Sequence, residues 1–173
     1  PDSFTVLVFG GSQGAAFINP IIARTLNKLH QENSLVQVIH MTGCETSAEE
    51  VKLLYLESGI AAHVKPFEKN MHFAWASADM VICRAGAATI AEAVEFEVPS
   101  ILIPYPTAAN QHQLKNAEFV SEEIKGSRYL EEKNLSPKEL LLLLKECNVG
   151  DMKRSIQTFK ENKRRRSLID HIE

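Results

Sequence analysis

Apolar and polar positions follow two different periods along the chain, and the pattern predicts strands that alternate with helices. Near-continuous apolar runs, such as "FTVLVFG" and "DMVICR", are typical of strands buried on both faces. The expected strands are 4–10, 35–41, 61–67, 79–84, 99–105 and 127–132, and the expected helices are 15–31, 47–59, 70–78, 87–97, 110–126 and 136–147, with one or two more in 151–173. This order predicts one α/β domain, a doubly wound parallel sheet of the Rossmann type.

Composition and charge narrow the class of protein. The 173 residues are 45% hydrophobic and 24% charged, which is typical of a globular domain with a real core. The net charge is −3, so no overall basic field favours a nucleic-acid partner. Cys44, Cys83 and Cys147 are far apart and are expected to be reduced thiols. The histidines lack ligand spacing, so we expect neither a metal site nor a cofactor.

The turn after the first strand has the composition of an anion site. Gly10 and Gly11 are followed by Ser12, Gln13 and Gly14, and then by a helical pattern. Glycines let a ligand approach the backbone, and a helix N-terminus presents N–H groups to an anion. The spacing is GGxxG, which is neither GxGxxG nor the P-loop pattern, and such a turn can also serve packing alone.

A second small-residue turn follows the strand at 79–84. Gly86, Ala87 and Ala88 lead into a helix, and two such turns facing one crevice can hold a diphosphate between them. Glu92 lies farther along that helix, where its carboxylate can accept two hydrogen bonds from the cis-diol of a ribose. A surface acid is the alternative for Glu92. Arg84 can pair with phosphate or with a structural carboxylate.

Neutral polar residues gather after the strand at 99–105. His112, Gln113 and Asn116 suit uncharged sugar hydroxyls, which need paired donors and acceptors, although an amide-rich helix start is the alternative. After the third strand, Phe67 and Met71 are placed where a flat nucleotide base can pack against them. The alternative for Phe67 is a position in the hydrophobic core.

Three segments together carry a family resemblance. "GGSQGA", "CRAGAATIAE" and "IPYPTAANQHQLKNA", in this order and spacing, resemble the C-terminal half of the MurG family of bacterial glycosyltransferases. That family has the GT-B architecture and transfers N-acetylglucosamine (GlcNAc) from UDP-GlcNAc to lipid I, forming lipid II for peptidoglycan. The resemblance extends from Val6 to about Gly126. Thr107 and Asn110 depart from it, because many members carry His and Asp there.

The resemblance implies a donor site spread over four segments. The first turn would lie by the diphosphate, the second turn would give backbone contacts beside it, and Glu92 would hold the ribose hydroxyls. Glu68 would contact uracil through backbone atoms. The implied contacts with UDP-GlcNAc are Gly11, Ser12, Gln13, Gly14, Phe67, Glu68, Met71, Arg84, Gly86, Ala87, Ala88, Glu92, His112, Gln113 and Asn116.

The same resemblance implies that residues 1–173 are the donor-binding domain of an inverting, metal-independent enzyme. The start at Pro1 fits an excised domain, and lipid I would bind through an absent N-terminal domain. We assign no catalytic base: His112 is the nearest candidate, but sugar contact is expected for it. The isolated chain should therefore catalyse little. The full-length enzyme would lie peripherally on the cytoplasmic face of the inner membrane, whereas the basic cluster at 163–166 is expected to be solvated.

Three other functions remain open at this point. One is a separate-chain donor subunit of a related UDP-GlcNAc transferase, as in the eukaryotic enzyme that makes the chitobiosyl lipid. Another is a non-catalytic module that binds sugar nucleotides. The third is a nicotinamide dehydrogenase, which is disfavoured because the second strand ends in His40-Met41 and not in the acid that holds an NAD ribose.

Overall fold

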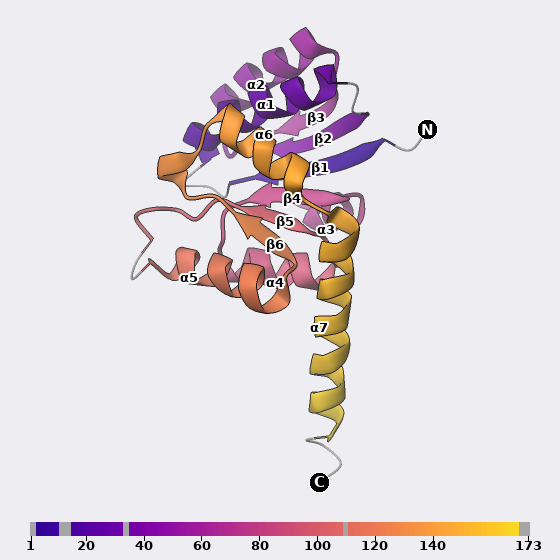
Figure 1. The fold of residues 1–173 in the computed structure, drawn as a ribbon. Helices are drawn as coiled ribbons and strands as arrows, with labels where there is room; N and C mark the ends of the chain where they lie inside the picture. Colours follow the sequence, from indigo (N-terminus) through magenta and orange to yellow (C-terminus); the bar gives the residue numbers. More distant parts are fainter. Residues whose placement is uncertain (1–2, 11–14, 33–34, 109–110, 170–173) are drawn as a thin grey trace.

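The computed structural model describes residues 3–10, 15–32, 35–108 and 111–169, and these residues form a six-stranded, all-parallel sheet (Figure 1). The strands are β1 (Phe4–Phe9), β2 (Val36–Met41), β3 (Ala61–Lys65), β4 (Met80–Cys83), β5 (Ser100–Leu102) and β6 (Ser127–Tyr129). Their order is β3-β2-β1-β4-β5-β6. The order reverses between β1 and β4, so the prediction of a doubly wound sheet is confirmed.

The helices follow the expected order with two differences. They are α1 (Ala15–Gln31), α2 (Glu45–Ser58), α3 (Met71–Ala76), α4 (Ala87–Glu95), α5 (His112–Phe119), α6 (Pro137–Glu146) and α7 (Val149–Ile169). The helix expected over 110–126 does not stay regular, because α5 passes into a π-helical segment, Val120–Ile124. This wider turn keeps both Val120 and Ile124 buried against the sheet. A short 3-10 helix, Glu132–Asn134, lies where the last strand was expected to end.

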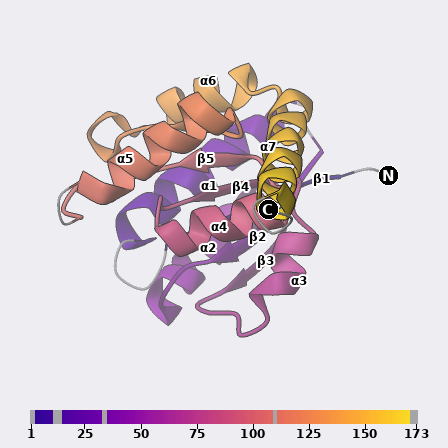
Figure 2. The same ribbon diagram turned by 90° about the horizontal axis from the view of Figure 1, so that it is seen from below.

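The described residues form two hydrophobic cores, one on each face of the sheet. Side chains alternate along a strand, so Val6 and Val8 of β1 enter the first core and Leu7 enters the second. Helices α1, α2 and α6 cover the first face, whereas α3, α4, α5 and α7 cover the second. Figure 2 looks along α7 from its C-terminal end and shows α4 and α5 beside it.

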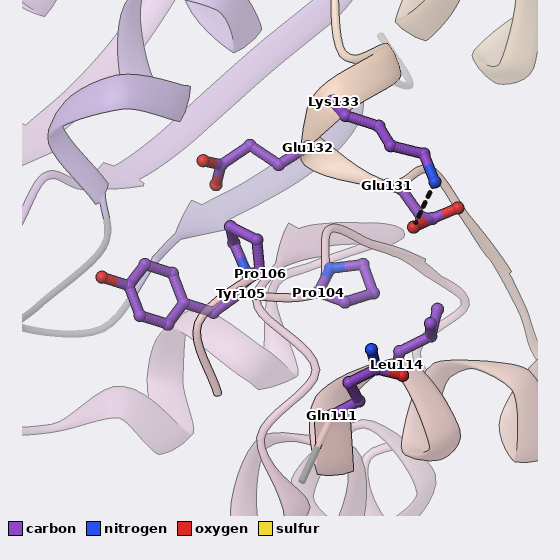
Figure 3. Close-up of a pocket in the computed structure, with 8 residues that line it drawn as sticks. All are labelled: Pro104, Tyr105, Pro106, Gln111, Leu114, Glu131, Glu132 and Lys133. Atoms are coloured by element: carbon purple, nitrogen blue, oxygen red, sulfur yellow. Dashed lines mark ion pairs between the residues drawn. The ribbon is translucent and has the colours of Figure 1, made fainter. Parts of the chain in front are cut away.

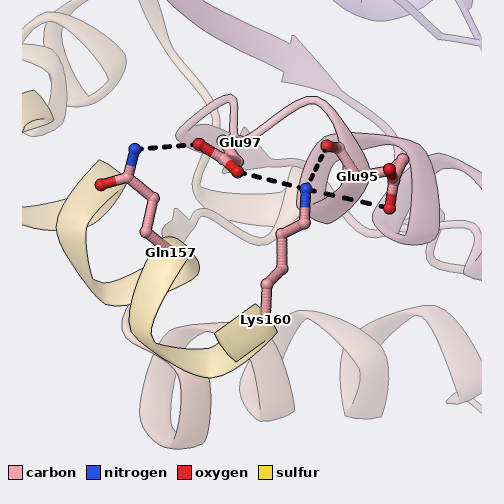
Figure 4. Close-up of polar contacts among 4 residues, drawn as sticks. All are labelled: Glu95, Glu97, Gln157 and Lys160. Atoms are coloured by element: carbon pink, nitrogen blue, oxygen red, sulfur yellow. Dashed lines mark hydrogen bonds and ion pairs between the residues drawn. The ribbon is translucent and has the colours of Figure 1, made fainter. Parts of the chain in front are cut away.

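Polar contacts hold α7 against the end of α4 and the loop that follows it (Figure 4). Gln157 donates to Glu97 Oε2 at 2.9 Å, and Lys160 Nζ donates to the carbonyl oxygen of Glu95 at 2.5 Å and to Glu97 Oε1 at 3.2 Å. The contact with Gln157, and then that with Lys160, lowers the pKa of Glu97. Glu97 has a φ of 58°, in the left-handed region, directly after α4. Beyond these contacts α7 extends away from the sheet (Figure 1).

We expect the change Gly126→Ala to lower the free energy of unfolding by about 1–3 kcal/mol. A Cβ at this position would overlap Cγ1 of buried Ile156 and would lie 3.0 Å from its Cδ1, so α7 would have to move. Gly150→Ala is the matched control, since its Cβ would come no closer than 3.6 Å to the atom of Asn148 that it meets. Urea unfolding followed by circular dichroism measures both, and equal stability of the two variants would contradict the prediction.

Candidate functional site

A cavity of about 190 Å³ opens at the C-terminal edge of the sheet, beside the reversal between β1 and β4. Phe9 and Met41 end β1 and β2, and the loop after β3 follows them around the rim. The lining residues come from strand ends, the following loops, α3 and α4: Phe9, Met41, Gly43, Pro66, Phe67, Glu68, Met71 and Glu92. Ligands of doubly wound sheets bind at this edge, so the cavity lies where the fold class places a site.

Glu92 is held at the rim of this cavity by a buried tryptophan. Its Oε2 accepts a hydrogen bond from the indole Nε1–H of Trp75 at 3.1 Å. Trp75 is 1% exposed, whereas Glu92 is exposed on α4. The structure therefore brings Glu92 together with Phe67, Glu68 and Met71, and its contact with a ribose stays a prediction.

The loop after β3 forms the opposite wall. Phe67 is 62% exposed, so its ring is a surface of the cavity and not a core residue. The Glu68 carboxylate accepts a hydrogen bond from the backbone N–H of Asn70 at 3.0 Å and pairs with Lys65 Nζ at 2.9 Å. These two contacts, the backbone one first, lower the pKa of Glu68 to about 2. Because the side chain is used to hold the loop, a ligand contact through the main chain of Glu68 remains the better prediction.

The start of α4 has the features of an anion site. Gly86 is the N-cap residue, with φ −67° and ψ 147°, and its position carries no side-chain cap. The first N–H groups of an α-helix have no partner within the helix, and the helix dipole makes this end positive. Ala87 and Ala88 are exposed, and their small side chains leave the backbone open to approach. A diphosphate contact here stays a prediction.

Arg84 has a structural role through its side chain. It is 7% exposed and pairs with Glu132 Oε2 through Nη2 at 2.6 Å. Its Nη1 donates to the carbonyl oxygens of Ile103 at 3.3 Å and Pro104 at 3.5 Å. Of the two interpretations of this side chain, the structure shows the ion pair with Glu132. A contact of Arg84 with the phosphates of a ligand stays a prediction.

The start of α5 braces the neighbouring loops. Asn116 donates from Nδ2 to the carbonyl oxygen of Ala85 at 3.1 Å, which fixes the turn before α4. Gln113 accepts from the backbone N–H of Tyr105 at 3.0 Å through Oε1. His112 is exposed at the first position of α5. Their expected contacts with sugar hydroxyls stay predictions, and the structure adds a bracing role for Asn116 and Gln113.

Four expected site residues, Gly11, Ser12, Gln13 and Gly14, lie outside the described residues, as does Asn110, which departs from the family pattern. Sequence reasoning also missed four residues that line the cavity, namely Phe9, Met41, Gly43 and Pro66. It missed the buried Trp75 as well, which does not line the cavity but donates a hydrogen bond to Glu92. The rule that ligands bind beyond the strand ends points to Phe9 and Met41. Nothing in the pattern marked Trp75, which has the spacing of a core residue.

A second hollow, of about 110 Å³, lies between the loops after β5 and β6 (Figure 3). It is lined by Pro104, Tyr105, Pro106, Gln111, Leu114, Glu131, Glu132 and Lys133. None of these residues was expected to contact the donor, and Glu132 here is the partner of Arg84. We therefore place the candidate site at the cavity beside the reversal between β1 and β4.

In the part of the chain that the structure describes, no helix is long and apolar enough to cross a membrane. Among the same residues, no group of three or more His, Cys, Asp or Glu side chains is arranged to bind a metal ion.

Comparisons with known proteins agree with this geometry. The chain is 44% identical over 172 residues to the UDP-N-acetylglucosamine–N-acetylmuramyl-(pentapeptide) pyrophosphoryl-undecaprenol N-acetylglucosamine transferase of Protochlamydia amoebophila, which covers 97% of this chain and 45% of the relative. The protein of the same name from Polynucleobacter asymbioticus is 38% identical over 86% of this chain and 41% of its own length. The crystal structure of Acinetobacter baumannii MurG superposes with a TM-score of 0.80 at 26% identity, over 91% of this chain and 46% of that one.

The matches also define how much of such a protein is present. The chain spans about half the length of the curated relatives it matches. Residues 5–172 match the family model described as the glycosyltransferase family 28 C-terminal domain. With the Rossmann-like sheet and the cavity at its switch point, this match shows that the chain belongs to glycosyltransferase family 28, as a C-terminal domain of that family.

Proposed function

We propose that residues 1–173 form the UDP-GlcNAc-binding domain of an inverting glycosyltransferase that adds GlcNAc to lipid I and so forms lipid II. The observation that carries the proposal is the Glu92 carboxylate, held at the rim of a cavity whose other wall is Phe67, Glu68 and Met71. A carboxylate facing an aromatic and thioether wall suits a nucleoside, with the base on the wall and the ribose diol on the acid.

The size of the cavity supports a divided donor site. Complete small-molecule sites have volumes of roughly 300–1,000 Å³. At about 190 Å³, this cavity is large enough for one part of a nucleotide sugar, and we assign that part to the uridine. The diphosphate then lies at the start of α4, and the sugar extends toward α5, where His112 and Gln113 stand at the first turn.

The reaction assigns distinct tasks to the two halves of the complete enzyme. The 4-hydroxyl of lipid I attacks the anomeric carbon, the bond from that carbon to the diphosphate breaks, and the electron pair leaves on UDP. N–H groups at the start of α4 stabilise the charge that develops on the leaving diphosphate. The acceptor and the base that takes its proton belong to the other half, which works at the cytoplasmic face of the membrane where the lipid acceptor lies.

Calorimetric titration with UDP-GlcNAc tests the proposal. We expect saturable binding, and we expect Glu92→Gln to weaken it by about 10- to 100-fold, because a charged acceptor for two hydroxyls is lost. Glu122→Gln is the control, since it changes an exposed glutamate that does not line the cavity.

UDP-GalNAc and NAD are the ligand controls. UDP-GalNAc differs at one sugar hydroxyl and should bind more weakly, and NAD should not bind. A folded chain that fails to bind UDP-GlcNAc, or that binds it equally well after Glu92→Gln, would overturn the proposal.

A further inference from the structure

The hydrogen bond between Trp75 and Glu92 joins a fully buried side chain to an exposed one at the rim of the cavity. We propose that Trp75 is a positioning residue of the donor site: its indole N–H fixes the Glu92 carboxylate in the orientation that selects a ribose over a deoxyribose. The inference rests on the proposed function, because it assigns the ribose diol to Glu92. It adds a residue that touches no ligand itself.

Two other aromatic rings pack against the indole of Trp75. Phe9 meets it edge-on, with centroids 5.5 Å apart and an interplanar angle of 83°. Phe96 stacks on it, with centroids 6.1 Å apart and an interplanar angle of 12°. Trp75 is 1% exposed in the second core, so the N–H cannot swing away without disturbing that core. The donor is therefore fixed before any ligand arrives.

A fixed donor changes what an exposed glutamate can do. The long side chain of a surface glutamate samples many rotamers, and ordering it on binding costs free energy. Here Oε2 is already bound by Trp75 at 3.1 Å. A carboxylate has about four acceptor positions on its two oxygens. Oε1 and the remaining position on Oε2 are then available to two adjacent hydroxyls.

This geometry predicts selectivity as well as affinity. A cis-diol offers two donors at a fixed separation, and a carboxylate held in one orientation can accept both. A 2′-deoxyribose offers only one, so it gains little from the fixed orientation. Loss of the indole N–H should therefore weaken the binding of a ribonucleotide much more than that of its deoxy analogue.

The experiment is a four-way comparison of the unmodified chain and Trp75→Phe, each titrated calorimetrically with UDP and with 2′-deoxy-UDP. Phenylalanine keeps an aromatic ring in the core and removes the N–H. We expect Trp75→Phe to weaken UDP binding by about tenfold and 2′-deoxy-UDP binding by less than about twofold, so the preference for ribose largely disappears. Phe73→Leu, which changes an exposed ring on the same helix, should leave both affinities unchanged.

The outcomes separate a positioning role from a merely structural one. Equal weakening of both ligands, or no change in either, would overturn the inference while leaving the proposed function intact. A lack of UDP binding by the unmodified chain would instead overturn the proposed function, and the inference with it.

A second measurement tests the positioning role of Trp75 even if the Trp75→Phe variant does not fold. The chain has one tryptophan, so its indole N–H gives a single assignable resonance in a ¹H–¹⁵N spectrum. Glu92→Ala should shift this resonance and speed its hydrogen exchange, because the acceptor is gone. A resonance unchanged by Glu92→Ala would overturn the inference.

Discussion

The change Glu132→Leu is expected to lower the free energy of unfolding by about 3 kcal/mol, because it leaves the charge of Arg84 buried without its carboxylate. The Arg84 side chain is 7% exposed, and the pair at 2.6 Å is its partner of opposite charge. The guanidinium also lies 5.1 Å from the centre of the Tyr105 ring, so it stays in place when the carboxylate is removed. We expect the lower end of the stability losses that follow from breaking a buried ion pair, because the Glu132 side chain is 20% exposed. Urea unfolding measures the change.

The neighbouring residue provides a matched control. Glu131 pairs with Lys133 at 3.0 Å, and both side chains are much more exposed (Figure 3). Glu131→Leu should therefore cost less than about 1 kcal/mol. The double change Arg84→Met with Glu132→Leu should recover part of the loss, because the buried guanidinium is removed together with its carboxylate partner. Equal effects at Glu131 and Glu132 would contradict the role assigned to the pair.

Acidification is expected to destabilise the domain through His40, by about 2 kcal/mol at about pH 5 and about 4 kcal/mol at about pH 3. Burial lowers the pKa of His40 from its ordinary 6.5 to about 3. Between these values the unfolded chain binds a proton that the folded chain does not bind. The contribution of the neutral His40 to the free energy of unfolding is therefore fully present above about pH 6.5, and it is lost as the pH decreases toward 3.

Both ring nitrogens of the neutral His40 have hydrogen-bond partners in the core. Asn19 donates from Nδ2 to the carbonyl oxygen of Thr42, so its Oδ1 faces His40 Nε2, at 3.1 Å, as an acceptor. Nε2 then carries the proton, and Nδ1 accepts from the Tyr55 hydroxyl at 3.0 Å. Burial raises the pKa of Tyr55, which keeps this hydroxyl protonated. A second proton, on Nδ1, would require the Tyr55 hydroxyl to give up its own donation to His40 and to accept instead.

Urea unfolding at several values between about pH 7.5 and about pH 5 tests the linkage. The variant His40→Gln should be less stable near neutrality but should show a flatter dependence on pH. His63→Gln, at an exposed histidine of β3, should retain the slope of the unmodified chain. The same slope in His40→Gln would show that other groups cause the acid sensitivity.

Much of the fold could be predicted from the sequence, because the central strands β1, β4 and β5 are buried on both faces and are therefore almost continuously apolar. Element ends were less certain. Lys65 ends β3, although the apolar and aromatic residues that follow favoured a longer strand. The π-helical turn after Phe119 could not be foreseen, because it depends on burying Val120 and Ile124 together in the second core. That requirement is set by tertiary packing and not by local sequence.

The candidate site was predictable where it follows strand ends and unpredictable where it depends on a partner. Phe67, Met71 and Glu92 could be proposed from position along the chain, and the structure gathers them at one cavity. The ion pair between Arg84 and Glu132 could not be predicted, because Glu132 lies far away in sequence. The role of Trp75 depended in the same way on Phe9 and on Glu92.

The separation of the two cores has a consequence for how such a domain can diverge. The helical residues that line the cavity, Met71 and Glu92, belong to α3 and α4, which cover the second face alone. Substitutions distant from one another, with no shared contacts, act nearly independently. Substitutions in the core under α1, α2 and α6 can therefore accumulate as neutral or stabilising variation, whereas substitutions under α3 and α4 change the shape of the cavity. The core on one face of the sheet can therefore gain stabilising substitutions while selection changes the residues on the other face.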